Sequence, residues 1–227
     1  MNLRAVKPPH ETRTRILDAA EELFMQHGFE GTSMRQLTAK AGANLAAVNY
    51  HFGSKDALIE AVFRRRLDPM NAARIAELDQ LEKDAAGHPL AAEAIIRAFV
   101  GASLRMIEDA KGGGRNFIRL LGRTHTDPQK PIRVLIGQLY APAMERFKRA
   151  FERAMPHMPR EEMHWRMHFM FGTLAYTLAA TDTVQLIAGC KPEDRYDARL
   201  LEARLTAFLQ AGLQAPLQAG DVKKKAA

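Results

Sequence analysis

Side chains suited to reading the edge of a DNA base gather in residues 42–55, GANLAAVNYHFGSK. The carboxamide of Asn49 can donate and accept hydrogen bonds together, which matches the pattern that adenine presents in the major groove. The small or apolar Leu45, Ala46 and Ala47 would let a helix backbone approach base edges and thymine methyl groups. These residues predict contact with the bases of double-stranded DNA, although Asn49 can equally contact a phosphate or water.

Residues on either side of this stretch are suited to phosphate contacts. Lys55 opens the next expected helix, where its own charge and the helix dipole both attract an anion. Thr32 and Ser33 would place a hydroxyl and unpaired N–H groups at another helix N-terminus. Arg35 and the basic N-terminal arm would add affinity that depends on salt and not on base sequence.

Two short helices are expected to position these side chains. One covers residues 34–41, Gly42 interrupts the chain, and residues 43–51 form the second. The apolar contacts between the two come from Leu37, Ala41 and Val48. This is the arrangement of a helix-turn-helix, in which one helix braces against the DNA backbone while the next enters the major groove.

Longer helices are expected before and after this pair. Thr12 or Thr14 can cap an amphipathic helix that Gly28 ends. Ser54 can cap the helix that follows, and its run of arginines at 64–66 is interpreted as a solvated face. Asp and Pro at 68–69 are a helix start signal, so the preceding helix should kink or stop there.

The N-terminal sequence resembles the TetR family of one-component transcriptional regulators over about Thr12 to Val62. The resemblance is carried by RILDAAEELF at 15–24, HGFEGTS at 27–33 and GANLAAVNYHFGSKDAL at 42–58, of which YHFGSK is the most diagnostic part. It implies an all-α homodimer with an N-terminal DNA-binding domain and a C-terminal domain whose pocket senses a small molecule. It also implies that Tyr50 and His51 meet phosphates. The alternatives are packing of Tyr50 against the first helix and a structural hydrogen bond for His51.

The fold class is all-α, because no segment shows the alternation of a strand. The domain boundary is expected near Asp68. The expected parts are a flexible basic arm at 1–11, a helix-turn-helix domain at 12–67, a helical effector-binding and dimerisation domain at 68–215, and a disordered tail at 216–227.

A partner subunit is indicated by residues 163–187, which are apolar on nearly every face of a helix and therefore need burial on all sides. A two-fold dimer would also double the number of bases read, with half-sites about 34–36 Å apart. The resemblance implies that the final helix joins this one in a four-helix interface. The predicted interface residues are Phe169, Phe171, Leu174, Leu178, Leu201, Leu205 and Phe208.

The helices between Leu90 and Phe151 can surround a cavity or simply pack together. The candidate pocket residues, each of which can also be ordinary core, are Phe99, Met106, Phe117, Arg119, Leu121, Leu135, Leu139 and Phe147. An apolar pocket would suit a hydrophobic or acyl ligand, and residues 116–123 are similar to regulators of fatty-acid and acyl-thioester metabolism. Arg115, Arg119 and Arg123 share a helix face that can receive a carboxylate or phosphate, or that is simply solvated.

The bulk composition bounds the remaining possibilities. A net charge of +7 over 227 residues favours a polyanionic partner. Cys190 is the only cysteine, so no intramolecular disulfide or cysteine zinc cluster is expected. The N-terminus lacks the apolar region of a signal peptide, and no apolar stretch reaches the roughly 20 residues that a membrane span needs. A cytoplasmic protein without membrane contact is expected.

Catalysis is not expected. His164 and His168 lie one helical turn apart and could face one metal ion, but they lack the HExxH order and are better explained as a solvated or helix-face pair. The sequence contains no Ser/His/Asp arrangement and no phosphate-binding glycine loop. No metal and no cofactor are therefore predicted.

The leading hypothesis is a homodimeric repressor that an apolar effector, with acyl compounds as one candidate class, releases from a palindromic operator. The effector would act by moving the two recognition helices off one-turn spacing. One alternative keeps the DNA binding but makes the second domain purely a dimerisation module. Another is a small-molecule carrier or enzyme with a vestigial helix-turn-helix. A third, DNA packaging without base specificity, fits poorly with the uncharged interior of the recognition helix.

Overall fold

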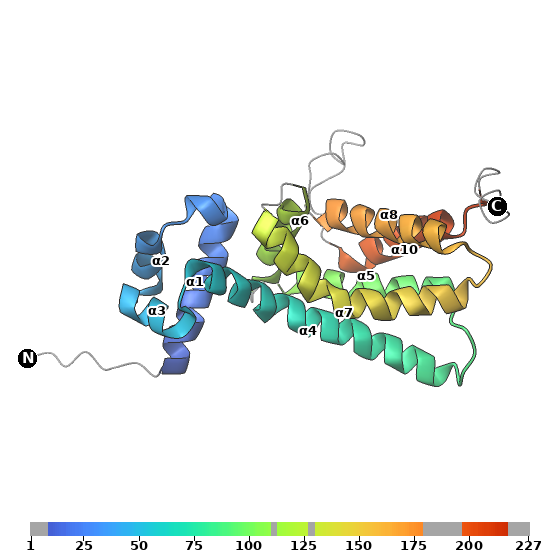
Figure 1. Cartoon of the computed structure of the whole chain (residues 1–227), viewed down its shortest axis with the longest axis horizontal. Coiled ribbons are helices and arrows are strands. Elements are labelled where there is room, and N and C mark those ends of the chain that lie inside the picture. Colours follow the sequence, from blue (N-terminus) through green and yellow to red (C-terminus); the bar gives the residue numbers. More distant parts are fainter. Residues whose placement is uncertain (1–8, 110–112, 127–129, 179–196, 218–227) are drawn as a thin grey trace, which may run out of the picture. The chain divides into compact units, whose positions relative to one another are not determined.

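The computed structural model describes residues 9–109, 113–126, 130–178 and 197–217. These residues form helices and connecting turns without any strand, which confirms the predicted all-α class (Figure 1). The helices are α1 (Pro9–Gly31), α2 (Met34–Ala41), α3 (Leu45–Phe52), α4 (Lys55–Asp84), α5 (Ala92–Glu108), α6 (Gly114–Thr126), α7 (Lys130–Ala154), α8 (Arg160–Leu178) and α10 (Ala198–Leu213). The chain divides into two compact units, Met1–Asp68 and Pro69–Ala227, which are described separately below.

The first helix begins earlier than the sequence suggested. It starts at Pro9 and not at Thr12, so the expected arm loses its last residues to α1. Proline is tolerated in a first helical turn because its missing N–H would have no partner within the helix. Gly28, with φ 73° and ψ 176°, interrupts the helix where glycine was expected to end it, and Thr32 Oγ1 donates to the Gly28 carbonyl at 2.8 Å.

The core of the N-terminal unit is built from the apolar stripe of α1. Ile16, Ala20 and Phe24 are buried there together with residues from each of the other three helices, namely Leu37, Val48, Leu58 and Val62. Contacts join α1 to α2, α1 to α3, and α2 to α3. The two short helices α2 and α3 are thus fixed on α1 and on each other, which gives α3 a defined orientation within this unit.

Helix α4 passes through the expected break. It runs from Lys55 to Asp84 with Pro69 inside it, so of the two expected outcomes, a kink or a stop, the stop is wrong. Proline removes one backbone hydrogen bond in a helix interior, but Leu67 and Met70 on either side of it are buried and hold both turns in place. Pro142 likewise lies inside α7 without splitting it.

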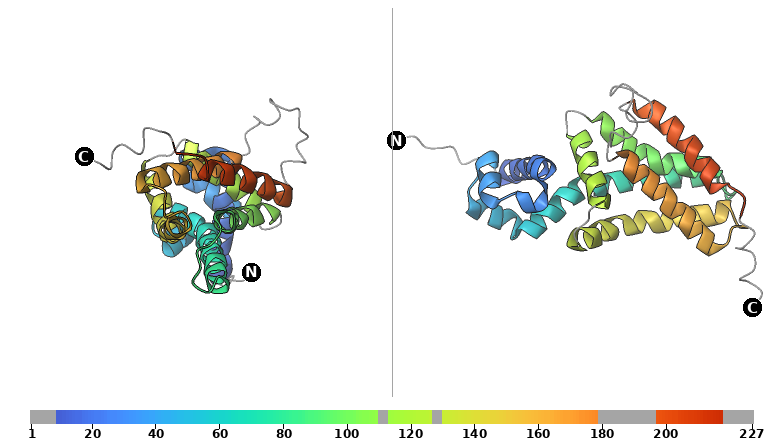
Figure 2. Two further views of the ribbon diagram at one scale, coloured as in Figure 1. Left: turned by 90° about the vertical axis from the view of Figure 1, so that its right-hand side faces the viewer. Right: turned by 90° about the horizontal axis from the view of Figure 1, so that it is seen from above.

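The C-terminal unit is organised around α5, most of whose residues are buried. Helix α5 contacts α6, α7 and α10, while α8 contacts α6, α7 and α10. Figures 1 and 2 show α10 alongside α5 and next to α8. Phe99 of α5 lies between Phe147 of α7 and Phe171 of α8, with ring centroids 5.1 and 6.4 Å away. The centre of this unit is therefore aromatic.

Arg166 joins α8 to the end of α10. Its Nη1 donates to the carbonyl oxygens of Leu213 and Ala215 at 2.8 and 2.6 Å, and its Nε donates to Glu162 Oε1 at 2.6 Å. The last carbonyls of a helix have no partner within it, so this buried guanidinium caps α10. At its other end α10 is capped by Asp197, whose Oδ1 accepts from the Leu200 N–H at 3.0 Å.

Two predictions concern residues that lie outside the described ranges. Cys190 and the part of the apolar helix beyond Leu178 belong to residues 179–196, and most of the predicted tail belongs to 218–227. Among the described residues, no helix combines the length and apolar character that crossing a bilayer requires.

Candidate functional site

Helix α3 is shorter than predicted at its start because Asn44 caps it. Asn44 has an extended backbone, and its Oδ1 accepts from the Ala47 N–H at 2.7 Å, so the helix runs over Leu45–Phe52 and not from residue 43. Gly42 before it and Gly53 after it have φ of 57° and 75°, a conformation that glycine adopts without strain. The two glycines allow an eight-residue helix to stand between sharp turns.

One side of α3 is anchored and the other is open to solvent. Val48 is 1% exposed and is the only buried residue of the helix. Leu45 is 52% exposed, and Ala46 and Asn49 are exposed beside it, with Ala47 half-buried. The Asn49 carboxamide has no hydrogen-bond partner within the fully described stretch 9–68. These side chains form the predicted base-reading face, which we call the α3 face.

Aromatic rings extend this face toward the end of α3. Tyr50 is 83% exposed, so it does not pack against α1 as the alternative interpretation required. His51 is half-buried and stands edge-on to Tyr50 at 5.1 Å. Arg13 of α1, which the sequence analysis missed, lies over the Phe52 ring at 5.3 Å and adds a positive charge next to it. Arg13 could have been found from sequence, because it is an arginine in the first turns of the helix that precedes the helix-turn-helix.

The start of α2 offers a phosphate site, but one of its two predicted hydroxyls does not contribute. Ser33 is exposed and forms a capping box with Gln36, whose N–H donates to Ser33 Oγ at 3.2 Å. Thr32 is only 2% exposed and its hydroxyl is bonded to Gly28, so the prediction that its side chain contacts phosphate is wrong. Arg35 is exposed in the first turn of α2.

The start of α4 is a second N-terminus on the same unit. Ser54 Oγ accepts from the Ala57 N–H at 3.1 Å and so caps this helix. Lys55 is its first residue and is half-buried. A lysine at a capped N-terminus combines a side-chain charge with the positive end of the helix dipole, which is the environment that the predicted phosphate contact needs.

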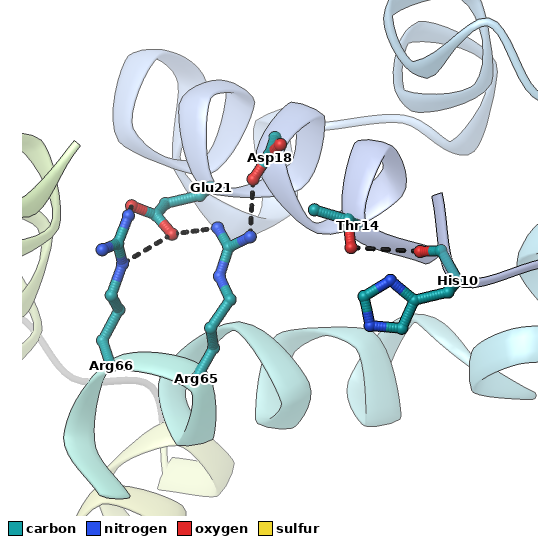
Figure 3. A network of polar contacts seen from close by, with 6 residues as sticks. All are labelled: His10, Thr14, Asp18, Glu21, Arg65 and Arg66. Atoms are coloured by element: carbon teal, nitrogen blue, oxygen red, sulfur yellow. Dashed lines mark hydrogen bonds and ion pairs between the residues drawn. The ribbon is translucent and has the colours of Figure 1, made fainter. Parts of the chain in front are cut away.

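Of the arginines at 64–66, which were expected to form a solvated face, Arg64 is exposed but Arg65 and Arg66 are not free in solvent (Figure 3). Arg65 and Arg66 both reach Glu21 of α1, whose side chain is 7% exposed. Arg66 Nη2 lies 2.8 Å from Glu21 Oε1, and Arg65 Nη1 lies 2.6 Å from Asp18 Oδ1. Burial lowers the pKa of Arg65, but its bonds with Glu21 and Asp18 outweigh this and raise the pKa overall. This cluster ties the start of α4 to α1.

The C-terminal unit contains a groove of about 650 Å³ between α6, α7 and α8. Its lining residues are Thr124, Arg133, Ile136, Gly137, Tyr140, Ala141, Met144, Glu145, Lys148, His164, Met167, His168 and Phe171. Most of the surface that these residues expose to the groove is apolar. The charged groups include Glu145 and Lys148, one helical turn apart on α7, and the imidazoles are those of His164 and His168, one turn apart on α8. Ile136, Tyr140 and Met144 recur every four residues on α7, and this spacing would have identified the groove from sequence.

The predicted pocket residues occupy other places. Phe99, Phe117 and Phe147 are fully buried and pack as core, and Leu139 is buried as well. Met106 and Leu135 are half-buried but do not line the groove. Leu121 lines a second cavity of about 10 Å³. The side chain of Arg119 lies outside the described residues, as do those of Arg115 and Arg123.

The predicted interface residues divide into core and surface. Leu174, Leu178 and Leu205 are buried within the unit, and Phe171 and Leu201 are half-buried. Phe169 of α8 is 60% exposed and Phe208 of α10 is 67% exposed. Trp165, Tyr176 and Leu200 are further large apolar side chains exposed on these two helices. We call these five exposed residues the aromatic face.

Metal binding finds no support in the described part of the chain, where no group of three or more His, Cys, Asp or Glu side chains is placed to hold an ion. His164 and His168 are exposed at the groove, and Trp165 lies edge-on to His168 at 5.9 Å.

Two family models match this chain. The model of bacterial regulatory proteins of the tetR family matches residues 16–62, and the model of the tetracyclin repressor-like C-terminal domain matches residues 97–212, just over half of the chain. Together they cover the helix-turn-helix and most of the unit that holds the groove.

Curated relatives match at the N-terminal end. The transcriptional repressor AcnR of Corynebacterium glutamicum is 36% identical over 78 residues, which are 34% of this chain and 39% of that protein. The transcriptional regulator UidR of Escherichia coli K12 is 43% identical over 51 residues, which are 22% and 26% of the two chains. The matched stretch therefore spans less than half the length of these relatives.

Solved structures are similar over nearly the whole chain. A tetR-family regulatory protein from Rhodococcus RHA1 aligns with a TM-score of 0.62 at 18% identity, over 89% of this chain and 96% of that one. The regulator FadR from Bacillus subtilis, in complex with stearoyl-CoA, aligns with a TM-score of 0.64 at 13% identity, over 88% and 98%. At such identities the likeness concerns the fold alone.

Proposed function

The chain belongs to the TetR family of bacterial regulators, and we propose that it is a sequence-specific DNA-binding repressor that acts as a homodimer and responds to a small apolar effector. The observation that carries the proposal is the α3 face. Its Leu45, Ala46 and Asn49 are open to solvent, while Val48 is buried and anchors the helix in its unit. Small and amide side chains on an exposed short helix suit major-groove contact.

Phosphate contacts would orient this face on the duplex. The capped starts of α2 and α4, with Ser33 and Lys55, supply N–H groups and charge without base preference. Exposed Arg35 and Arg13 add further positive charge on the same unit. The similarity to AcnR, a transcriptional repressor, and to UidR, a transcriptional regulator, both of the helix-turn-helix type, supports the same function.

Dimerisation is supported by the aromatic face. Exposed apolar residues scattered singly need no explanation, but contiguous ones mark interaction surfaces. Trp165 and Phe169 lie one helical turn apart on α8 with ring centroids 5.9 Å apart, and α10, which carries Phe208, contacts α8. A second copy of the same two helices would cover these rings and form the predicted four-helix interface.

An effector site is supported by the groove of about 650 Å³, whose volume and apolar character suit a small organic molecule. FadR, which shares the fold, was solved with stearoyl-CoA, so an acyl compound fits the same architecture. Helix α4 contributes residues to both units, from Lys55 at its start to Asp84 at its end. A coupling of about 1–3 kcal/mol between effector and operator would be enough for regulation.

The test is selection of bound sequences from a random duplex library with the full-length protein, followed by titration of the enriched site at several salt concentrations. We expect a palindrome whose half-sites lie about one helical turn apart. Asn49→Ala should weaken binding to it by about 1–3 kcal/mol and relax the base preference at one position per half-site. Gln138→Ala, which removes an exposed carboxamide from α7 in the other unit, is the matched control and should change nothing.

The opposite result is equally clear. If no sequence is enriched and affinity depends on salt alone, the binding is nonspecific and the proposed repressor function is wrong. The carrier or enzyme with a vestigial helix-turn-helix would then be the better hypothesis.

A further inference from the structure

A buried arginine in the C-terminal unit has only uncharged partners among the described residues. Arg74 of α4 is 1% exposed. Its Nε donates to the Phe99 carbonyl at 2.9 Å, Nη1 donates to Asn71 Oδ1 at 3.0 Å, and Nη2 donates to Ser103 Oγ at 2.5 Å. The guanidinium also lies over the Phe99 ring, with Cζ 4.2 Å from its centroid. No carboxylate of the described residues bonds to it.

This arrangement leaves a positive charge in an apolar interior, with no counter-ion supplied by the part of the chain that the structure describes. Burial lowers the pKa of Arg74, and the nearby Tyr140 phenol partly opposes that shift. Arginine nevertheless stays protonated in proteins, so the charge persists. A buried ion without an opposite charge is destabilising, and a site that tolerates this cost is suited to receive an anion.

The space beside Arg74 borders the groove. Arg74 and Ser103 line the cavity of about 10 Å³, which has room for at most one water molecule. Two rings, Tyr140 and Phe171, line both this cavity and the groove of about 650 Å³. They meet edge-on with centroids 5.5 Å apart. The half-buried Phe171 side chain therefore stands between the groove and the buried charge.

We propose that the groove binds an amphipathic carboxylic acid whose carboxylate pairs with Arg74 and Ser103 and whose apolar part lies along Met144 and Met167. This rests on the proposed effector function and names the chemical class of the effector. Rotation of Phe171 joins the small cavity to the groove and admits the head group. The planar guanidinium matches a carboxylate with two parallel hydrogen bonds. Ser103 Oγ accepts from Arg74 and donates to Met70 Sδ at 3.7 Å, and on binding it exchanges this weak sulfur acceptor for the ligand carboxylate.

The geometry favours a free carboxylate over a phosphate-bearing head group. The cavity at Arg74 is too small for a nucleotide, so such a group would have to stay at the rim of the groove. There Lys148 is already paired with Glu145 at 2.9 Å. Glu145 also accepts from Arg149 at 3.0 Å. Arg133 adds a further cation to the lining, so the rim keeps a net positive charge. These side chains are more exposed than Arg74, so an ion pair with them is weaker than one with the buried guanidinium.

Binding at Arg74 would act directly on α4. Arg74 joins α4 to α5 through Phe99 and Ser103, and Asn71 Nδ2 donates to the Leu139 carbonyl at 3.0 Å and joins α4 to α7. A carboxylate that takes Ser103 or Arg74 out of this network changes what holds the middle of α4. The effector would therefore alter the helix that continues into the DNA-binding unit.

The proposal is tested by direct binding to the full-length protein without DNA. Trp165 is the only tryptophan, and its contact with the groove residue His168 makes its fluorescence a reporter, with calorimetry as the second method. The probes are dodecanoic acid, its methyl ester, the corresponding alcohol and dodecanoyl-CoA. We expect the acid to bind at least tenfold tighter than the ester, the alcohol or the CoA thioester.

Substitutions at Arg74 test whether this residue causes the preference for the acid over the ester. Arg74→Met should bind acid and ester equally, and Arg74→Lys, which keeps the charge, should retain most of the preference. Arg97→Met removes an exposed arginine of α5 and should behave as the natural protein. If Arg74→Met does not fold, the proposal is still tested by whether the natural protein binds the free acid more tightly than the ester. Equal binding of acid and ester, tighter binding of the CoA thioester, or a folded Arg74→Met that keeps the preference would overturn the proposal.

The failure of this proposal is distinguishable from failure of the effector function. An acid that binds through Arg74 but leaves an operator complex intact supports the site and overturns the effector role. An operator complex that another compound releases while no acid binds overturns the carboxylate site and leaves the repressor function standing.

Discussion

The cluster formed by Glu21 with Arg65 and Arg66 gives the sharpest test of how the DNA-binding unit is held together. Glu21→Gln keeps the shape of the side chain but removes its charge. Three hydrogen bonds from two guanidinium groups end on this carboxylate. A glutamine would present an amide N–H₂ group to donors that need an acceptor.

The magnitude follows from burial. Breaking a fully buried ion pair costs about 3–5 kcal/mol. Here the Glu21 side chain is 7% exposed, but those of Arg65 and Arg66 are 24% and 17% exposed. In the variant, Arg65 also keeps its hydrogen bond with Asp18. We therefore expect a loss at the lower end of that range, about 3 kcal/mol, in the free energy of opening this unit.

Amide hydrogen exchange is the assay, because it reports the opening free energy of α1 and the first turns of α4 separately from the rest of the chain. Glu60→Gln is the matched control, since Glu60 pairs with Arg64 one helical turn away and both side chains are exposed. The control should leave protection unchanged. A loss below about 1 kcal/mol for Glu21→Gln, or equal effects of the two variants, would refute the assignment of this cluster as a buried anchor.

Other predictions concern single features. Val48→Ala should destabilise the N-terminal unit by roughly 2 kcal/mol, because it empties the anchor of α3, and urea unfolding followed by circular dichroism measures it. Ser33→Ala should cost about 1 kcal/mol by the same method, since it removes the capping box of α2. Phe208→Glu together with Phe169→Glu should convert a dimer to a monomer in analytical ultracentrifugation, and an unchanged mass would contradict the assignment of the aromatic face. Arg166→Met should increase hydrogen exchange in the last turn of α10, and unchanged exchange there would show that the cap is dispensable.

The helix-turn-helix could be predicted from sequence because its signals are local. Gly28, Gly42 and Gly53 all have positive φ and end or interrupt helices where glycine indicated. The start of α3 was misjudged because Asn44 and Ala43 both fit a helix by type, and only the bond from Asn44 Oδ1 to the Ala47 N–H shows which one is outside it. Pro69 indicated a helix start that the structure does not have. Its local preference is overridden because the turns on either side of it are buried.

The groove was harder to predict because it depends on how helices far apart in sequence meet. Phenylalanine was taken as a sign of a pocket, yet Phe99, Phe117 and Phe147 fill the core completely. Arg74 gave no signal, because an arginine in a charged helix is usually solvated. Its burial arises only when α5 and α7 close over α4, and no pattern within α4 itself reports this.

The single buried side chain of α3 has a consequence for how such proteins diverge. Because Val48 is the buried anchor of the helix and Leu45, Ala46 and Asn49 are exposed, substitutions at these three exposed positions should change the stability of the fold little. A duplicated gene can therefore exchange Leu45, Ala46 or Asn49 and acquire a new DNA target without first accumulating compensating mutations in the core. The separation of a buried anchor from an exposed reading surface would thus let the operator change while the fold is kept.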